Sequence, residues 1–143
     1  MKKWYIGAGV VVVAIGVLLA KRPGGEEPSV TVAMASLDIM PREVKTAPKV
    51  VREAYQFAVA NPTVLKEVPC YCGCGGMGHT SNYSCYVTEV PDGRAQFDGH
   101  ALGCSICVDI ALDTKRLMEK GASLPEMRLY VDATYSKYGP SNM

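Results

Sequence analysis

The chain has 143 residues, enough for one domain and a short additional segment. Its formal net charge is +1, but four of the 15 basic residues lie in the first 22 positions, so the remaining positions hold 11 basic and 14 acidic residues, a net charge of about −3. This balance argues against the basic patch or stripe of a nucleic-acid-binding domain, so we expect no nucleic acid among the partners.

Residues 1–22 predict a transmembrane signal anchor. The run Trp4–Ala20 contains 17 residues without a charge, which just reaches the roughly 17–25 residues that a membrane-spanning helix needs. A cleaved signal peptide is the alternative, but the large Leu18 makes a poor cleavage site after Ala20. No cysteine precedes Cys70, which excludes a lipoprotein anchor. We expect a single-pass membrane protein whose C-terminal domain lies outside the cytoplasm, at the cell surface or in the periplasm.

Residues 23–45 predict a linker, and residues 46–143 a cysteine-rich soluble domain. Proline, glycine and glutamate dominate the start of the linker, and no sustained hydrophobic period follows up to Lys45. Thr46 suits the N-cap of a first helix. Apolar residues then recur at helical spacing until Asn61, where the following proline disfavours further helix.

The rest of the domain predicts two more helices and a short hairpin. Residues 85–90 have strand composition, and a turn signal at 91–93 would return the chain through residues 95–97. The second helix runs from about Cys104 to Lys120, and the third begins at the capping box Ser123–Glu126. The predicted fold is therefore mostly α: an N-terminal transmembrane helix plus a small three-helix domain with an irregular, cysteine-rich centre and a short β-hairpin.

All six cysteines fall between residues 70 and 107, in a pattern typical of a metal site. Cys70, Cys72 and Cys74 alternate, so in extended backbone their side chains share one side. Cys104 and Cys107 are three residues apart at a predicted helix start, where i and i+3 share a face. With Cys85 and the two histidines between these groups, the predicted metal ligands are Cys70, Cys72, Cys74, Cys85, Cys104, Cys107, His79 and His100.

The donor types indicate the metal. Thiolates are soft ligands that select Cu(I) or Zn, so we expect Cu(I) first and Zn second. The thioether of Met77 would favour copper, although a lone methionine is more often structural. Two nearby carboxylates, Asp98 and Asp109, are more simply explained as helix-start or surface charges.

Three alternatives to a metal site stay open at this stage. An oxidising compartment favours disulfides, and the six cysteines could pair the first trio with Cys85, Cys104 and Cys107. One disulfide beside a metal site is a second arrangement. A thiol-disulfide redox protein using Cys104 and Cys107 is a third.

The segment Pro69–Cys74 reads Pro-Cys-Tyr-Cys-Gly-Cys and resembles the motif of the PCYCGC-motif protein family. The segments 78–82, 85–87, 98–100 and 104–110 are also similar to that family, so the resemblance covers roughly residues 48–138. It implies an exported bacterial or archaeal protein that is suspected of binding metal rather than of being an enzyme. Many members are lipoproteins, whereas this chain carries an apolar anchor without the lipoprotein cysteine, and Ala101 stands where the family favours glycine.

The residues and the resemblance together predict a function. We expect a membrane-anchored extracytoplasmic protein, not an enzyme, that captures or delivers Cu(I) through clustered cysteine and histidine. Its expected partners are a transition-metal ion, the membrane, and a membrane protein complex or metal transporter. The alternatives are a structural accessory subunit of a membrane complex stapled by zinc or disulfides, and the thiol-disulfide redox protein.

Overall fold

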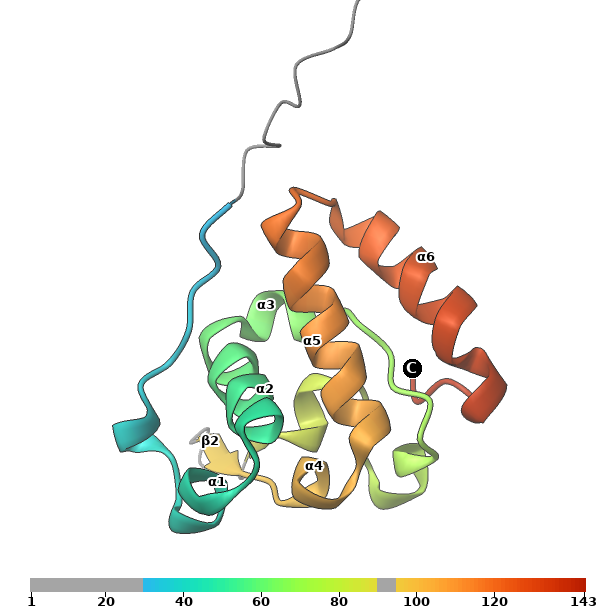
Figure 1. Ribbon diagram of the computed structural model, residues 1–143. Helices are drawn as coiled ribbons and strands as arrows, with labels where there is room; N and C mark the ends of the chain where they lie inside the picture. Colours follow the sequence, from blue (N-terminus) through green and yellow to red (C-terminus); the bar gives the residue numbers. More distant parts are fainter. Residues whose placement is uncertain (1–29, 90–94) are drawn as a thin grey trace, which may run out of the picture.

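The computed structural model describes residues 30–89 and 95–143, and it is mostly helical (Figure 1). The predicted transmembrane anchor, the start of the predicted linker and the predicted hairpin turn lie outside these residues. Within the described ranges, no helix combines the length and the apolar character needed to cross a bilayer.

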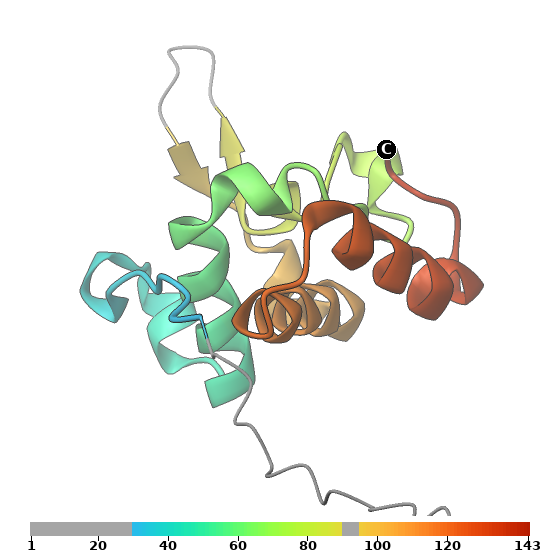
Figure 2. The same cartoon turned by 90° about the horizontal axis from the view of Figure 1, so that it is seen from above.

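Three long helices form the frame of the domain: α2 (Lys49–Ala60), α5 (Ser105–Glu119) and α6 (Leu124–Tyr135). They correspond to the three helices that the hydrophobic period predicts. Helix α5 lies between the other two and contacts both, as Figures 1 and 2 show from two directions. The predicted capping box at Ser123 and Glu126 is present and begins α6, since each side chain satisfies a backbone N–H of the first turn.

Three short helices accompany the frame: α1 (Arg42–Thr46), α3 (Pro62–Leu65) and α4 (His100–Gly103). The described residues thus contain six α-helices rather than the three expected. Helices of four or five residues are too short to show a hydrophobic period in the sequence, so pattern analysis detects only the long ones. The same residues also form four single-turn 3₁₀ helices: η1 (Leu37–Ile39), η2 (Cys74–Met77), η3 (Tyr83–Cys85) and η4 (Ser136–Tyr138).

A two-stranded antiparallel sheet stands at one edge of the helices (Figure 2). Strands β1 (Val87–Glu89) and β2 (Ala95–Phe97) pair with Val87 opposite Phe97, which confirms the predicted hairpin. The buried Val87 faces the core cluster, and Phe97 packs against that cluster as well. The hairpin therefore continues directly from the segment that carries Cys85.

The segment 30–45 packs against the helices, although its sequence predicts a linker. The N–H of Ala35 donates to the carbonyl of Gln56 in α2, and the N–H of Val30 donates to the carbonyl of Glu119 at the end of α5. Met40 and Val44 are buried in the core. Residues of the predicted linker, from Val30 on, thus pack as part of the domain, before the predicted boundary at Thr46. A few separate side chains and backbone hydrogen bonds hold this segment, and such scattered contacts produce no hydrophobic period in the sequence.

The core runs without a break from the apolar helices into the cysteine-rich centre. Aromatic side chains fill its middle, with Tyr55 and Tyr86 in an edge-to-face contact at 4.9 Å between ring centroids. Four sulfurs belong to the same buried cluster: those of Cys70, Cys74, Cys85 and Cys107. Helices and hairpin therefore enclose the candidate site instead of presenting it on an outer loop.

Candidate metal centre

The motif segment forms a tight loop that turns its sulfurs inward. Cys74 begins the 3₁₀ helix η2, and the residues on either side of η2, Gly73 and Gly78, have φ values of +82° and +87°. Residues with a side chain rarely adopt this left-handed backbone conformation, so glycine is the residue that permits both bends. The loop can then bring alternate cysteines and His79 around one small volume.

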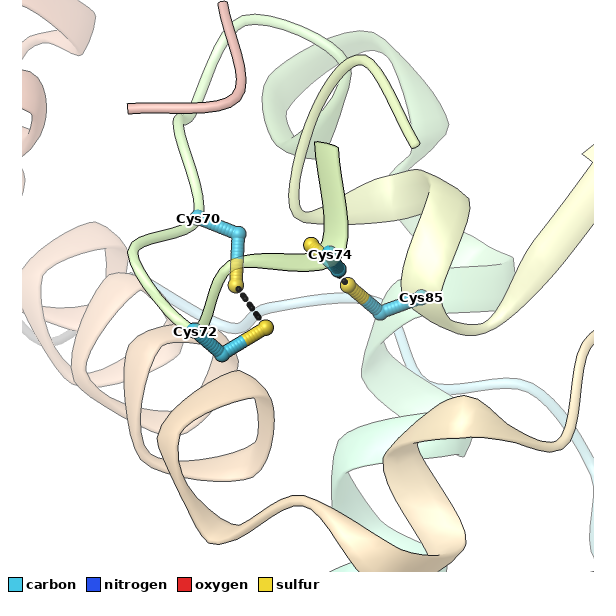
Figure 3. A group of neighbouring side chains, drawn as sticks. All are labelled: Cys70, Cys72, Cys74 and Cys85. Atoms are coloured by element: carbon cyan, nitrogen blue, oxygen red, sulfur yellow. Dashed lines mark hydrogen bonds between the residues drawn. The ribbon is translucent and has the colours of Figure 1, made fainter. Parts of the chain in front are cut away.

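Three sulfurs form a nearly equilateral triangle at the start of α5. The Sγ atom of Cys70 lies 3.5 Å from that of Cys72 and 3.5 Å from that of Cys107. The third edge, between Cys72 and Cys107, is also 3.5 Å. Figure 3 shows the first edge, with the Cys70 and Cys72 sulfurs pointing toward each other. Residues 37 positions apart thus meet because the first turn of α5 lies against the motif loop.

A second sulfur pair lies beside the triangle. The Sγ atoms of Cys74 and Cys85 are 3.7 Å apart, and both residues are buried. Cys85 ends the 3₁₀ helix η3 and approaches Cys74 from the segment that leads into β1 (Figure 3). The two pairs in Figure 3 belong to one group, since one ligand atom from each of Cys70, Cys72, Cys74 and Cys85 lies within 4.8 Å of the others.

The two histidines connect the sulfurs into further four-donor groups. The Nε2 atom of His100, at the start of α4, lies 3.4 Å from the Sγ atom of Cys72. One further group, with all ligand atoms within 4.8 Å of one another, contains Cys72, His100, Cys104 and Cys107. The other contains Cys74, His79, Cys85 and His100. The structure therefore brings together all eight residues that the sequence predicts as ligands.

His79 carries a buried nitrogen that is free for a metal ion. Its side chain is only 7% exposed, and its Nε2 atom lies 3.5 Å from Oδ2 of Asp98. The other ring nitrogen, Nδ1, is buried and has no hydrogen-bond partner in the described part of the chain. A histidine that ligates a metal through one nitrogen commonly donates the other N–H to a carboxylate. The arrangement of His79 fits a metal-bound imidazole.

Asp98 contacts the imidazole of His79 and the backbone of His100, a role that the sequence did not reveal. Its Oδ1 atom accepts a hydrogen bond of 2.7 Å from the backbone N–H of His100, while Oδ2 faces the ring of His79. The sequence predicts Asp98 as a helix-start or surface charge. Asp98 does lie at the start of α4, and the structure adds its contact with His79. Its backbone is itself fixed, since the Tyr55 hydroxyl donates to its carbonyl at 2.7 Å.

Asn142 holds the motif loop from the opposite end of the chain. Its Oδ1 atom accepts a hydrogen bond of 2.7 Å from the N–H of Cys70, and its own N–H donates to the Cys70 carbonyl at 3.1 Å. Its Nδ2 atom lies 3.5 Å from the Sγ atom of Cys74 and donates to the carbonyls of His79 and Ser81. Nothing in the sequence marks this asparagine, because its only link to the cysteines is the path of the C-terminal tail across the loop (Figure 2).

Burial and mutual hydrogen bonds divide the thiols into two classes. Hydrogen bonds from Cys107 and then Cys85 lower the pKa of Cys70 well below that of a free thiol. Burial is the main cause that raises the pKa of Cys72 and of Cys74. The hydrogen bond that Cys107 donates to Cys70 likewise raises its own pKa. Cys70 is therefore the thiol whose pKa the cluster lowers, while the pKa of each of its neighbours Cys72, Cys74, Cys85 and Cys107 is raised.

All six cysteines lie in the described residues and all are free. Their closest sulfurs are 3.5 Å apart, whereas a disulfide bond is about 2.05 Å long.

Two residues that the sequence offers as weaker ligand candidates lie on the surface: Met77 is 60% exposed, and Asp109 is exposed on α5. Neither belongs to the three four-donor groups.

A family model described as "Protein of unknown function with PCYCGC motif" matches residues 25–142. The chain belongs to this family. The motif supplies three of the eight donors, while the matched region contains all eight and also Asp98 and Asn142. No curated protein and no solved structure matches the chain. The family match therefore covers the motif and all eight donors, and its description assigns them no chemistry.

The geometry of this PCYCGC protein is that of a site that could hold a metal ion. A tetrahedral ion with metal–sulfur bonds of about 2.3 Å holds its sulfurs about 3.8 Å apart, close to the 3.5 and 3.7 Å found here. The clustered cysteines and histidines can therefore hold a metal ion with little movement.

Proposed function

We propose that this protein is a membrane-anchored, extracytoplasmic binding protein, not an enzyme, that captures or delivers Cu(I). The observation that carries the proposal is the convergence of eight sulfur and nitrogen donors on one enclosed centre, as free thiols and imidazoles. A centre that only braced the fold would need four such donors. The excess suits a protein whose task is to hold metal.

Copper is supported by the composition of the centre. Six of the eight donors are sulfurs, and soft thiolates select Cu(I) or Zn, of which Cu(I) is the softer ion. The two imidazoles are borderline ligands that accept Cu(I) or Zn. Zinc is thus the second candidate, and a direct competition between the two ions separates them.

The location and the partner rest on the sequence. The uncharged run Trp4–Ala20 supports a single-pass anchor with the domain outside the cytoplasm. An anchored copper-binding domain suits exchange with a membrane protein, such as a metal transporter or a membrane complex that contains copper. Labelling of the anchor-bearing chain in intact cells with a membrane-impermeant thiol reagent, after metal removal, tests this location. Reaction only after the cells are opened would contradict it.

Elemental analysis tests the metal. The full chain, purified without oxygen, is expected to contain copper and to show six reactive thiols once the copper is removed and the protein is unfolded. Given equal Cu(I) and Zn(II) under reducing conditions, it is expected to retain copper. A chain that binds neither ion when reduced would overturn the proposal.

One observation favours a structural alternative. Cys70, Cys74, Cys85 and Cys107 are almost completely buried, as in closed zinc sites that only stabilise a fold. Exchange separates the two functions: a delivery protein releases its ion to a competing chelator while its helices stay folded, whereas a structural site releases it only on unfolding. In the redox alternative only Cys104 could react first, because Cys107 is buried and Cys104 is partly exposed, so alkylation of the folded, metal-free chain tests it.

A further inference from the structure

Four-coordinate binding of a single ion leaves half of the donors unexplained. The three four-donor groups together contain eight residues, and no group contains more than half of them. Whichever group holds one ion, at least two buried or half-buried cysteines remain outside it. These groups overlap instead of lying apart, so the centre is not a set of separate sites.

The overlap falls mainly on sulfur atoms. Cys72 belongs to two groups, and Cys74 and Cys85 both belong to two groups. A thiolate sulfur has several lone pairs and can bind two metal ions at once, whereas each imidazole nitrogen has a single lone pair and binds one. Of the shared residues only His100 is not a cysteine. A single nitrogen of His100 can bind only one ion, so His100 cannot bridge two ions through one atom as a sulfur can.

Cys72 has the contacts of a bridging ligand. Its sulfur lies 3.5 Å from the sulfurs of both Cys70 and Cys107 and 3.4 Å from Nε2 of His100. It thus belongs at once to the triangle of sulfurs and to the group that includes Cys104 and His100. On the other side, Cys74 and Cys85 form a pair at 3.7 Å that faces His79 as well as the triangle.

From this sharing, we propose that the centre holds a thiolate-bridged cluster of more than one Cu(I) ion, with Cys72 and the Cys74–Cys85 pair as bridges. The inference rests on the proposed function and goes beyond it, because it states how many ions are bound and which sulfurs connect them. Cu(I) is suited to such a cluster, since it accepts two or three sulfur ligands and shares thiolates readily. The Cys70–Cys72–Cys107 triangle offers it three.

The test counts ions in the full chain. The reduced, metal-free protein is titrated with Cu(I) without oxygen and examined by native mass spectrometry, and X-ray absorption at the copper edge measures the copper neighbours. We expect at least two Cu(I) ions per chain and a short copper–copper distance. One ion per chain without a copper neighbour would overturn the cluster and leave the proposed function intact. Absence of any bound ion would overturn both.

Two matched variants test the bridge. Cys72 and Cys104 are both half-buried, but Cys72 belongs to two groups and Cys104 to one. Cys104→Ser is expected to keep more than one ion, while Cys72→Ser loses the copper–copper signal and binds fewer ions. Equal losses in the two variants would overturn the bridging role of Cys72. Circular dichroism checks each fold first, and if Cys72→Ser does not fold, the count and the copper–copper distance in the unmodified chain decide.

Discussion

At the scale of single residues, the ligands are prepared by neighbours that do not themselves bind metal. Asn142 ties the backbone of Cys70 and the carbonyl of His79 together, while its amide faces the sulfur of Cys74. Gly139 allows this approach, because a Cβ atom there would lie 2.9 Å from the carbonyl oxygen of Tyr71. The C-terminal tail thereby restrains the motif loop before any ion arrives.

Asp98 allows a test of such preparation by a single atom change. Asp98→Asn keeps the side-chain size but removes the negative charge that faces His79, so the imidazole is less well oriented and a weaker donor. We expect Cu(I) affinity to fall by about 10-fold or more. A competition titration with a coloured Cu(I) chelator measures it.

Asp109→Asn is the matched control for this substitution. Asp109 is exposed and outside the donor groups, so its variant should bind copper as tightly as the unmodified chain. Equal affinities in the Asp98 and Asp109 variants would show that the carboxylate does not support the site.

At the scale of elements, α5 couples the core to the centre. Its first turn carries Cys107, whose carbonyl accepts hydrogen bonds from the hydroxyl of Tyr86 at 2.7 Å and from Nδ2 of Asn82 at 3.2 Å. One turn further on, Ile110 is fully buried. The packing of α5 against its neighbours therefore determines where one corner of the sulfur triangle lies.

Truncation of Ile110 tests how strongly α5 is held. Ile110→Ala removes buried methyl groups and leaves a cavity, so we expect the free energy of unfolding to fall by about 2–5 kcal/mol. Urea denaturation of the reduced, metal-free chain measures this change.

Ile39→Ala provides the same chemical change on the surface. Ile39 is 59% exposed in η1, and its truncation should alter the free energy of unfolding by no more than about 0.5 kcal/mol. Similar losses for the two isoleucines would contradict the core assigned to α5.

At the scale of the whole molecule, the apolar core and the cysteine centre form one continuous body. Much of the core, including Tyr55, Phe57 and Val131, is not made of metal ligands. The aromatic and aliphatic part should thus stay folded when the metal is removed, unlike a zinc finger, which unfolds. This feature suits a protein that must release its ion and bind another.

Metal removal gives the corresponding prediction. The reduced, metal-free chain should keep its helical circular dichroism, because the apolar core remains. Excess Cu(I) should then raise the melting temperature by about 10 °C or more, since free ion at 1,000 times Kd adds about 4 kcal/mol of stability. A metal-free chain without helical signal would contradict this prediction and support the structural alternative. An unchanged melting temperature would contradict metal binding by the native state.

The sequence alone determined the features that depend on neighbours along the chain. The hydrophobic period located α2, α5 and α6, the capping box located the start of α6, and strand composition located the hairpin. The motif and the spacing of cysteine and histidine identified the whole set of candidate donors. The helices, the cap, the hairpin and the motif are each encoded within a short segment, and the remaining donors are recognised by residue type, so local pattern is sufficient for them.

Only the tertiary structure decided which donors meet and what supports them. The contact of Cys70 with Cys107 spans 37 positions, and that of Asn142 with Cys70 spans 72. The packing of residues 30–45 and the approach of Asp98 to His79 belong to the same class. Such contacts depend on how whole helices pack and on the path of the C-terminal tail. Both result from many weak interactions between distant parts of the chain, so they cannot be predicted from any short segment.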